Sequence, residues 1–405
     1  MVAWPLLFSH QSRARRWGAA AGILLVGLAV GAALYLTQPH IRARLDDLRA
    51  NAGERTRPIM WRGAWAIFCE HPAWGGGAGS YNVLFEQHRP ETFQDNPRWA
   101  HNDYLNTLAD YGSVGFLLSF GAIAGLIWRH RQTEPRVPAA PATGDATPDE
   151  AGFRQALALG LLAFALHLTV DFHLKIPALA QAVAIMGGLL LGRRPPPGTR
   201  PTCGPASWAR RSGYGAAALV VGATVLGVIY PRYRAEALRL AARESIDHLA
   251  IQEHPPADRS RVLARATQQL EAATDQAPSH GQAWADLAYA LALQARETPA
   301  RTVELGRQAE SAARQALAHS TALPESWLRL GAALDMQGRW TEAGDAFTRA
   351  QALAPNSLPV CFLHAYHLAL RQHTRPEARA LVDKCLRLDP NHRAAQVLRQ
   401  HLIRP

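Results

Sequence analysis

His101-Asn102-Asp103-Tyr104-Leu105 stands just before an apolar run that extends from Tyr111 through Gly112-Ser113-Val114-Gly115 to Trp128. The run ends at Arg129-His130-Arg131. An apolar helix of this length can cross a bilayer, and polar or ionisable side chains beside such a helix are costly to keep there. The stretch predicts a helical membrane domain whose functional site lies at the membrane surface.

Further apolar stretches approach the roughly 20 residues that a membrane span needs. With the first run, the expected spans are Trp17 to Leu36, Tyr111 to Trp128, Gln155 to Val170, Ile176 to Gly192 and Gly213 to Tyr230. Arginine clusters at 13–16, 129–131, 193–194 and 210–211 fall on one side if all of these segments span. Because positive charge favours the cytoplasmic side, we expect the amino terminus inside and the carboxyl terminus outside. A re-entrant pair formed by the third and fourth segments would leave this orientation unchanged.

This topology predicts a multi-pass membrane protein whose carboxyl-terminal domain lies outside, in the periplasm if the cell has two membranes. Residues 1–36 form the amino-terminal cytoplasmic segment and first span, and residues 37–110 form a periplasmic loop that holds the candidate site. Residues 111–230 form four further spans with cytoplasmic loops at 132–150 and 195–207, and residues 231–405 form a periplasmic domain. Eight arginines lie in the external stretch 37–103, where orientation does not explain them. Anion binding is the obvious reason for them.

Composition narrows the class of protein. Hydrophobic residues make up 48% of the chain while the mean hydropathy is only -0.12, so the apolar residues are concentrated, mainly in the first 230 positions. The net charge of +11 is better explained by membrane topology than by nucleic acid, because no aromatic-basic recognition module accompanies it. The cysteines show neither CxxC nor a zinc spacing, so we expect no metal site and no cofactor. Cys361 and Cys385 are expected as buried side chains rather than as a disulfide.

After Tyr230 the sequence becomes polar, helical and repetitive. Trp327-x2-Leu330-Gly331-x2-Leu334, Gly338, Ala343-x3-Phe347, Ala350 and Pro355 follow the tetratricopeptide pattern, in which a small residue lets two helices touch and a large one fills the gap beside it. An earlier repeat opens at Trp284 with about nine extra residues between its helices, and a later one opens at Cys361 with one inserted residue. Residues 266–278 look like the second helix of a degenerate unit. We expect an α-solenoid from Arg234 to Pro405, so the whole chain should be all-α.

The external stretch carries two weaker signals. Arg57-x3-Trp61-x3-Trp65 has the spacing of an amphipathic helix, and its tryptophans are better explained as packing residues or interfacial anchors than as a site. The glycines of Gly75-Gly76-Gly77-x-Gly79 permit close approach of a ligand to the backbone but also suit an ordinary turn. No strand and no GK[ST] accompany these glycines, so they do not predict a phosphate-binding loop.

Taken in order, these motifs resemble the O-antigen ligase and polymerase family of bacterial membrane glycosyltransferases. The resemblance covers about residues 50 to 195 and rests on Arg57-Pro58-Ile59-Met60-Trp61, His71-Pro72-Ala73-Trp74-Gly75-Gly76-Gly77-Ala78-Gly79, Ala100 to Leu105, Tyr111 to Gly115, and His167-x3-Asp171-Phe172. It implies transfer of a glycan from undecaprenyl diphosphate to an acceptor hydroxyl on a lipid, a glycan or a protein. Members commonly carry about ten to twelve spans, more than the ~20-residue rule finds here, so we expect the chain to lack the amino-terminal half of such an enzyme.

The resemblance assigns chemical roles to particular side chains. A diphosphate leaving group develops negative charge, which a guanidinium meets with paired charge-assisted hydrogen bonds. Arg57 is the candidate catalytic arginine, and Arg62 is a neighbour that would help to bind the substrate.

The acceptor hydroxyl must be oriented and must lose its proton, and an imidazole, which titrates near neutral pH, suits that task. His101 is the candidate base. Asn102, Asp171 and His167 are candidate substrate-binding residues, although Asn102 or Asp103 is also a preferred helix cap and Asp171 has the alternatives of orienting the histidine or marking the exit to water.

A second hypothesis treats the chain as a membrane-anchored scaffold in envelope polysaccharide assembly. Tetratricopeptide grooves bind proteins, and this domain occupies more than a third of the sequence. The scaffold hypothesis predicts that Arg57 and His101 are dispensable while the solenoid is required.

Overall fold

The computed structural model describes residues 13–50, 56–133, 148–191, 205–251 and 255–403. Within these ranges the chain is helical and contains no strand, in agreement with the expected all-α class. The expected cytoplasmic loops at 132–150 and 195–207 lie largely outside the described residues. Backbone contacts divide the chain into two compact units, Met1–Pro58 and Ile59–Pro405.

The smaller unit contains an apolar helix followed by a short charged one. Helix α2 (Arg13–Thr37) has 25 residues, and α3 (Pro39–Ala50) begins at a proline, which suits the first turn of a helix. The two helices meet where Tyr35 Oη donates a hydrogen bond of 2.9 Å to Asp46 Oδ1. The side chains of Leu25, Val26 and Leu28 are exposed on α2. Among the described residues, the apolar part of this helix, Leu25–Thr37, is shorter than a membrane span.

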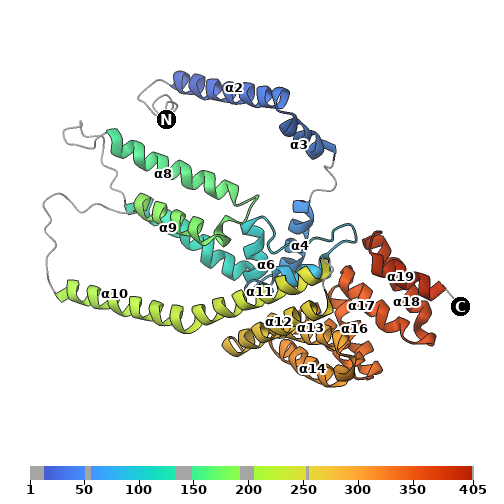
Figure 1. Ribbon diagram of the computed structural model, residues 1–405. Helices are drawn as coiled ribbons and strands as arrows, with labels where there is room; N and C mark the ends of the chain where they lie inside the picture. Colours follow the sequence, from blue (N-terminus) through green and yellow to red (C-terminus); the bar gives the residue numbers. More distant parts are fainter. Residues whose placement is uncertain (1–12, 51–55, 134–147, 192–204, 252–254, 404–405) are drawn as a thin grey trace. The chain divides into compact units, whose positions relative to one another are not determined.

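The first part of the larger unit contains a series of helices of unequal length. They are α4 (Thr56–Glu70), α5 (Tyr81–His88), α6 (Asp103–Phe116), the π-helical turn η1 (Leu117–Gly121), α7 (Ala122–Thr133), α8 (Pro148–His167), the 3-10 turn η2 (His173–Lys175), α9 (Pro177–Leu191), α10 (Pro205–Thr224), the π-helical turn η3 (Val225–Ile229) and α11 (Tyr230–Ile251) (Figure 1). Helix α4 begins in the smaller unit and continues into the larger one.

Two stretches of the described residues are long and apolar enough to cross a membrane. They are Asp103–Arg129, which runs through α6, η1 and α7, and Gly215–Leu249, which runs through α10, η3 and α11. Their apolar side chains are exposed, for example Leu118 at 71% and Leu219 at 76%, and such surfaces are expected to contact lipid. Figure 1 shows α10 and α11 as one long helix, so the apolar segment continues into the polar one without a break.

The helices at the expected third and fourth spans have other bounds than the sequence indicated. Helix α8 ends at His167 rather than Val170, because the chain turns at 168–170 and buries Leu168. Helix α9 has 15 residues, which at 1.5 Å per residue is less than the roughly 30 Å of a hydrocarbon core. The second expected span, Tyr111 to Trp128, begins earlier than expected, since the helix starts at Asp103 and bends at Gly112, whose φ is 64°.

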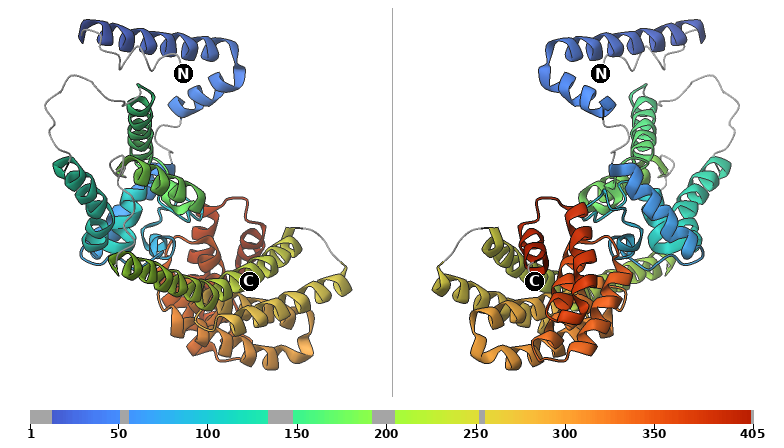
Figure 2. Two further views of the ribbon diagram at one scale, coloured as in Figure 1. Left: turned by 90° about the vertical axis from the view of Figure 1, so that its left-hand side faces the viewer. Right: turned by 90° about the vertical axis from the view of Figure 1, so that its right-hand side faces the viewer.

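The second part of the larger unit is a stack of antiparallel helix pairs (Figures 1 and 2). The pairs are α11 with α12 (Pro256–Gln276), α13 (Gly281–Glu297) with α14 (Thr302–His319), α15 (Pro324–Asp335) with α16 (Trp340–Leu353), and α17 (Leu358–Ala369) with α18 (Arg375–Leu388), and α19 (Arg393–Ile403) follows the last pair. The 3-10 turns η4 (Pro299–Arg301) and η5 (Gln372–Thr374) lie inside two of the connections. Helix α12 confirms the degenerate first unit, and α11 is its partner.

Packing inside the repeats follows the small-and-large rule. A Cβ added to Gly331 would lie 2.9 Å from the ring of Phe347, which is 2% exposed, so the glycine makes room for the ring. The extra residues of the earlier repeat were expected between its two helices. Instead, they lengthen both helices. Helix α13 has 17 residues against 12 in α15, and α14 has 18 against 14 in α16. Cys361 and Cys385 are both buried and unbridged.

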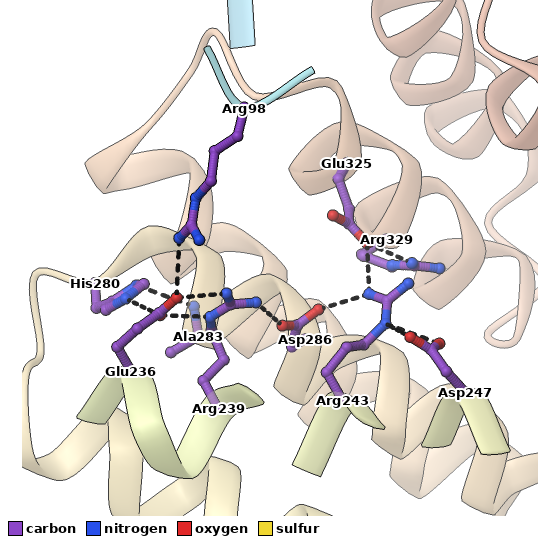
Figure 3. Close-up of polar contacts among 10 residues, drawn as sticks. All are labelled: Arg98, Glu236, Arg239, Arg243, Asp247, His280, Ala283, Asp286, Glu325 and Arg329. Carbon is purple, nitrogen blue, oxygen red and sulfur yellow. Dashed lines mark hydrogen bonds and ion pairs between the residues drawn. The ribbon is translucent and has the colours of Figure 1, made fainter. Parts of the chain in front are cut away.

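A network of charged side chains crosses the first three helix pairs (Figure 3). Asp286 on α13 is fully buried and accepts hydrogen bonds from Arg239 at 2.8 Å and from Arg243 at 2.9 Å, both on α11. Glu325 on α15 accepts from Arg243 at 3.3 Å and from Arg329 at 2.6 Å. The network ties the first pair to the next two through charge-assisted bonds.

Candidate functional site

Helix α4 supports the site by packing one face on α5 and α6. Met60, Ala64 and Ile67 are buried, and a Cβ at Gly63 would meet the ring of Phe85 at 2.4 Å, so only glycine permits this contact. Trp61 donates from Nε1 to the carbonyl oxygen of His101 at 3.2 Å. Trp61 is half-buried and its partner is the backbone of the candidate base, whereas Trp65 is 52% exposed, so the expectation that both tryptophans pack is not met by Trp65.

The glycine-rich stretch packs against the backbone of α6. The amide groups of Gly76 and Gly77 donate to the carbonyls of Ala109 and Asp110 at 2.8 and 3.0 Å. Gly75 has a φ of 70°, and a Cβ there would lie 2.4 Å from the amide nitrogen of Tyr111. The turn interpretation therefore holds for Gly75 to Gly77: the close approach that glycine permits is to the kinked helix.

Buried polar side chains on one face of α6 hold this arrangement. Asp110 accepts from the amide of Tyr81 at 3.0 Å and from Asn106 Nδ2 at 2.7 Å, and Lys175 Nζ lies 3.6 Å from it. Asp103 accepts from the amide of Leu174 at 2.8 Å. Two carboxylates thus join three segments that are far apart in the sequence.

His101 lies at the start of this helix with its ring between α6 and the segment after α8. Its Nδ1 is 3.3 Å from Asp171 Oδ1, and the ring of Phe172 contacts the imidazole edge-on at a centroid distance of 4.6 Å. The backbone is left-handed, with a φ of 49°, and about a third of the side chain is exposed. The two atoms are close enough for an ion pair when the imidazole is protonated, but Nδ1 makes no hydrogen bond. That Asp171 orients the histidine stays a prediction.

His167 and His173 stack on each other beside Asp171. Their ring centroids are 4.4 Å apart with an interplanar angle of 2°, and ligand atoms of these three residues lie within 4.8 Å of one another. This set has the composition of a cation site. The stacked geometry does not fit one, since imidazole lone pairs lie in the ring planes and two parallel planes do not meet at a common ion.

The remaining candidates lie on α4 and at the start of α6. Asn102 is the N-cap of α6 and accepts from the amide of Leu105 at 3.0 Å, so its side chain serves the helix rather than the histidine cluster. Asp103, the alternative cap, is used instead by the contact with Leu174. Arg57 is exposed in the first turn of α4, and Arg62 is exposed one turn later.

Sequence reasoning missed Asn106, Asp110, His173 and Lys175. A signal for the first two is present in the sequence: positions 103, 106 and 110 place polar side chains on one face of an apolar helix, at intervals of three and four. A polar stripe on a membrane helix indicates contact with protein or with a water-filled cavity. For His173 and Lys175 the sequence offers no comparable pattern.

Comparison with known families places this geometry in context. Residues 1–120 match the family model of the O-antigen ligases, and residues 324–357 match that of the tetratricopeptide repeat. The chain thus joins a segment similar to the O-antigen ligases to a segment similar to the tetratricopeptide repeat. No curated protein matches the sequence.

The ligase match divides the candidate residues. It contains Arg57, Arg62, His101 and Asn102, and it ends before Asp171. The carboxylate beside His101 therefore comes from a part of the chain beyond the ligase match. The O-antigen ligases are a membrane protein family, which agrees with the exposed apolar helices, and the repeats indicate a role in protein interaction.

Proposed function

We propose that the protein transfers a glycan from undecaprenyl diphosphate to an acceptor hydroxyl at the outer face of a bacterial inner membrane. The acceptor oxygen attacks the anomeric carbon of the glycan, and the bond from that carbon to the diphosphate oxygen breaks. His101 Nε2 accepts the hydroxyl proton, and undecaprenyl diphosphate leaves with the bonding electrons. The acceptor is a lipid, a glycan or a protein.

The observation that carries this proposal is the pairing of His101 with Asp171 at the start of the apolar stretch Asp103–Arg129. A carboxylate near Nδ1 favours the tautomer that carries its proton on that atom and so leaves the lone pair on Nε2. The imidazole is partly exposed, as a base must be to reach an acceptor hydroxyl. His167 lies beside Asp171 and is proposed to contact the sugar.

The guanidinium groups on α4 are proposed to hold the diphosphate. Arg57 and Arg62 are both exposed, and the ligase match includes both. A planar guanidinium presents two parallel donors to phosphate oxygens, which stabilises the charge on the leaving group.

Arg57→Lys should lower transfer by about 100-fold or more, because an ammonium does not reproduce the two-donor fork and loss of one such donor commonly costs that much. The assay is transfer of lipid-linked glycan in membranes of the native host, with and without a chelator. Arg42→Lys is the matched control, since Arg42 is exposed and lies over the ring of Tyr35. Normal transfer by Arg57→Lys, or loss of wild-type transfer on chelation, would refute the mechanism.

We also propose that residues 37–110 and 231–405 lie in the periplasm, with the spans and cytoplasmic loops of 111–230 between them. A reporter fused after Pro405 should be active in the periplasm, and one fused near Ala140 should be active in the cytoplasm, because arginine clusters mark the inner side. Alkaline phosphatase and a fluorescent protein are suitable as a pair of reporters. Cytoplasmic activity of the carboxyl-terminal fusion would rule out this topology.

A scaffold role remains the second candidate, favoured by the repeats themselves, whose groove would bind a protein partner. If the protein is a scaffold, a variant in which Arg57 is replaced would still allow surface glycan to form. Deletion of the repeats would abolish it.

A further inference from the structure

Residues 86–98, from the last turn of α5 to the residue before Trp99, form a folded segment that we call the docking segment. Arg89 is its centre: the side chain is 3% exposed and its guanidinium contacts both oxygens of Glu86. It also donates to the carbonyl of Asp95 at 2.7 Å and to Asn96 Oδ1 at 2.6 Å. This arginine therefore folds the segment on itself and is not available to an anion, unlike the role that composition suggested for arginines here.

The folded docking segment contacts the repeats at the connection between α16 and α17. Asn356 Nδ2 donates to the carbonyl of Arg89 at 2.7 Å, and Gln94 Nε2 donates to the carbonyl of Asn356 at 3.2 Å. Asn356 lies within the tetratricopeptide match. In each bond a side-chain amide of one segment donates to a backbone carbonyl of the other, and the two bonds run in opposite directions. Together they restrict the distance between the two segments.

Charged contacts extend this interface to both ends of the solenoid. Glu91 lies 3.6 Å from Arg387 and 4.0 Å from Lys384, both on α18. At the other end, Arg98 lies 3.9 Å from Glu236 on α11 (Figure 3). The side chains of these ion pairs are largely exposed, so each pair alone contributes little to the stability of the interface. Together they place opposite charges against each other along it.

The docking segment continues directly into the catalytic candidate. Trp99 stacks on Phe172 at a centroid distance of 4.7 Å, and the amide of Ala100 donates to Asn106 Oδ1 at 2.9 Å. Both contacts restrict the chain between Arg98 and His101. Movement of the segment by the repeats would therefore be transmitted to the histidine.

We propose that the repeat domain docks on residues 86–98 of its own ligase segment and thereby sets the position of His101. The docking part of this proposal stands on the contacts alone, and the effect on His101 rests on the proposed function. A cleft of about 440 Å³ lies between the two surfaces, with Asn96 and Arg98 on one side and Arg243 and Arg329 on the other. A partner bound in that cleft would touch both and so change the docking.

Chemical cross-linking tests the docking without reference to activity. In a Cys69→Ser, Cys203→Ser background, Gln94→Cys with Asn356→Cys should be joined by a short bismaleimide in native membranes. Mass spectrometry of the proteolytic peptides measures the joined fraction. Gln94→Cys with Gln308→Cys, on the exposed side of α14, is the matched control. Equal yields from the two pairs would overturn the proposal.

Charge reversal tests the effect on the site. Glu91→Lys should lower both the cross-linked fraction and kcat by roughly two- to fivefold, because it places three cations together at an exposed interface. KM for the lipid-linked donor should stay unchanged. Adding Lys384→Glu and Arg387→Glu should restore both readouts, which loss of folding would not allow, and Asp345→Lys on α16 is the charge-matched control.

The outcomes separate the two proposals. If cross-linking follows the expected pattern and the wild type transfers no glycan, docking stands and the proposed function fails. If the wild type transfers glycan while Glu91→Lys changes neither readout, or the reversed pair fails to restore them, docking does not position His101.

Discussion

His101→Ala should reduce glycan transfer by about two to four orders of magnitude, the range that loss of a general base commonly produces. Nδ1 of the imidazole lies 3.3 Å from Asp171, and the substitution removes the ring without touching the buried contacts of Asp103 and Asp110. The measurement is the initial rate of transfer in membranes, normalised to the amount of inserted protein.

The control for this experiment must account for the backbone of His101. Its φ of 49° is unfavourable for alanine, whereas asparagine adopts left-handed conformations more readily. His101→Asn should therefore fold like the wild type and still lack transfer. His71→Ala, at an exposed histidine in the same external stretch, should transfer normally. Near-normal transfer by His101→Asn would exclude the imidazole as the base.

Local patterns in the sequence predicted the repeat region in detail. The spacing from Gly331 to Phe347 specifies which residues touch, because the rule depends on neighbouring helices joined by a short turn. The one inserted residue of the last repeat appears in the connection that contains η5. The extra residues of the earlier repeat were misplaced, because a helical pattern does not show whether added residues extend a helix or the turn.

The candidate site was only partly predictable, because its decisive contacts join distant segments. His101 and Asp171 were both chosen from motifs, but the structure was needed to bring them within 3.3 Å. The contact of Asp103 with Leu174 spans 71 positions, and no periodicity encodes such a pairing. The same limit explains why the sequence left the cap open between Asn102 and Asp103.

The arginines of the external stretch show a second limit of sequence reasoning. Their charge suggested anion binding for the whole set, yet Arg89 is buried within its own loop. Charge composition does not distinguish a guanidinium that closes a loop from one that meets a ligand. The sequence does offer partners for closing the loop. Glu86 lies three positions before Arg89, and Asn96 lies soon after it.

Asp286→Ala should lower the free energy of unfolding of the repeat domain by about 3–5 kcal/mol, the cost of removing one partner from a buried ion pair. Asp286 is fully buried and holds Arg239 and Arg243, whose guanidinium groups would then lose their shared acceptor. Burial opposes ionisation of nearby Glu325, but Arg329 and Arg243 outweigh it and keep the pKa of that carboxyl below its usual value. Glu325 and Asp247 would still accept from Arg243, and Glu236 from Arg239, which keeps the cost within this range.

Hydrogen exchange of the amides of α13 in the full-length protein in detergent measures this change, since their slowest exchange reports unfolding of the domain. Asp247→Ala is the matched control, because it also removes an aspartate that pairs with Arg243, but at a position that is about half exposed. It should lower the free energy of unfolding by at most about 1 kcal/mol. The difference between the two variants isolates burial from charge, because both lose a carboxylate that faces the same guanidinium. Equal destabilisation by the two would show that the buried network does not hold the first helix pair to the next.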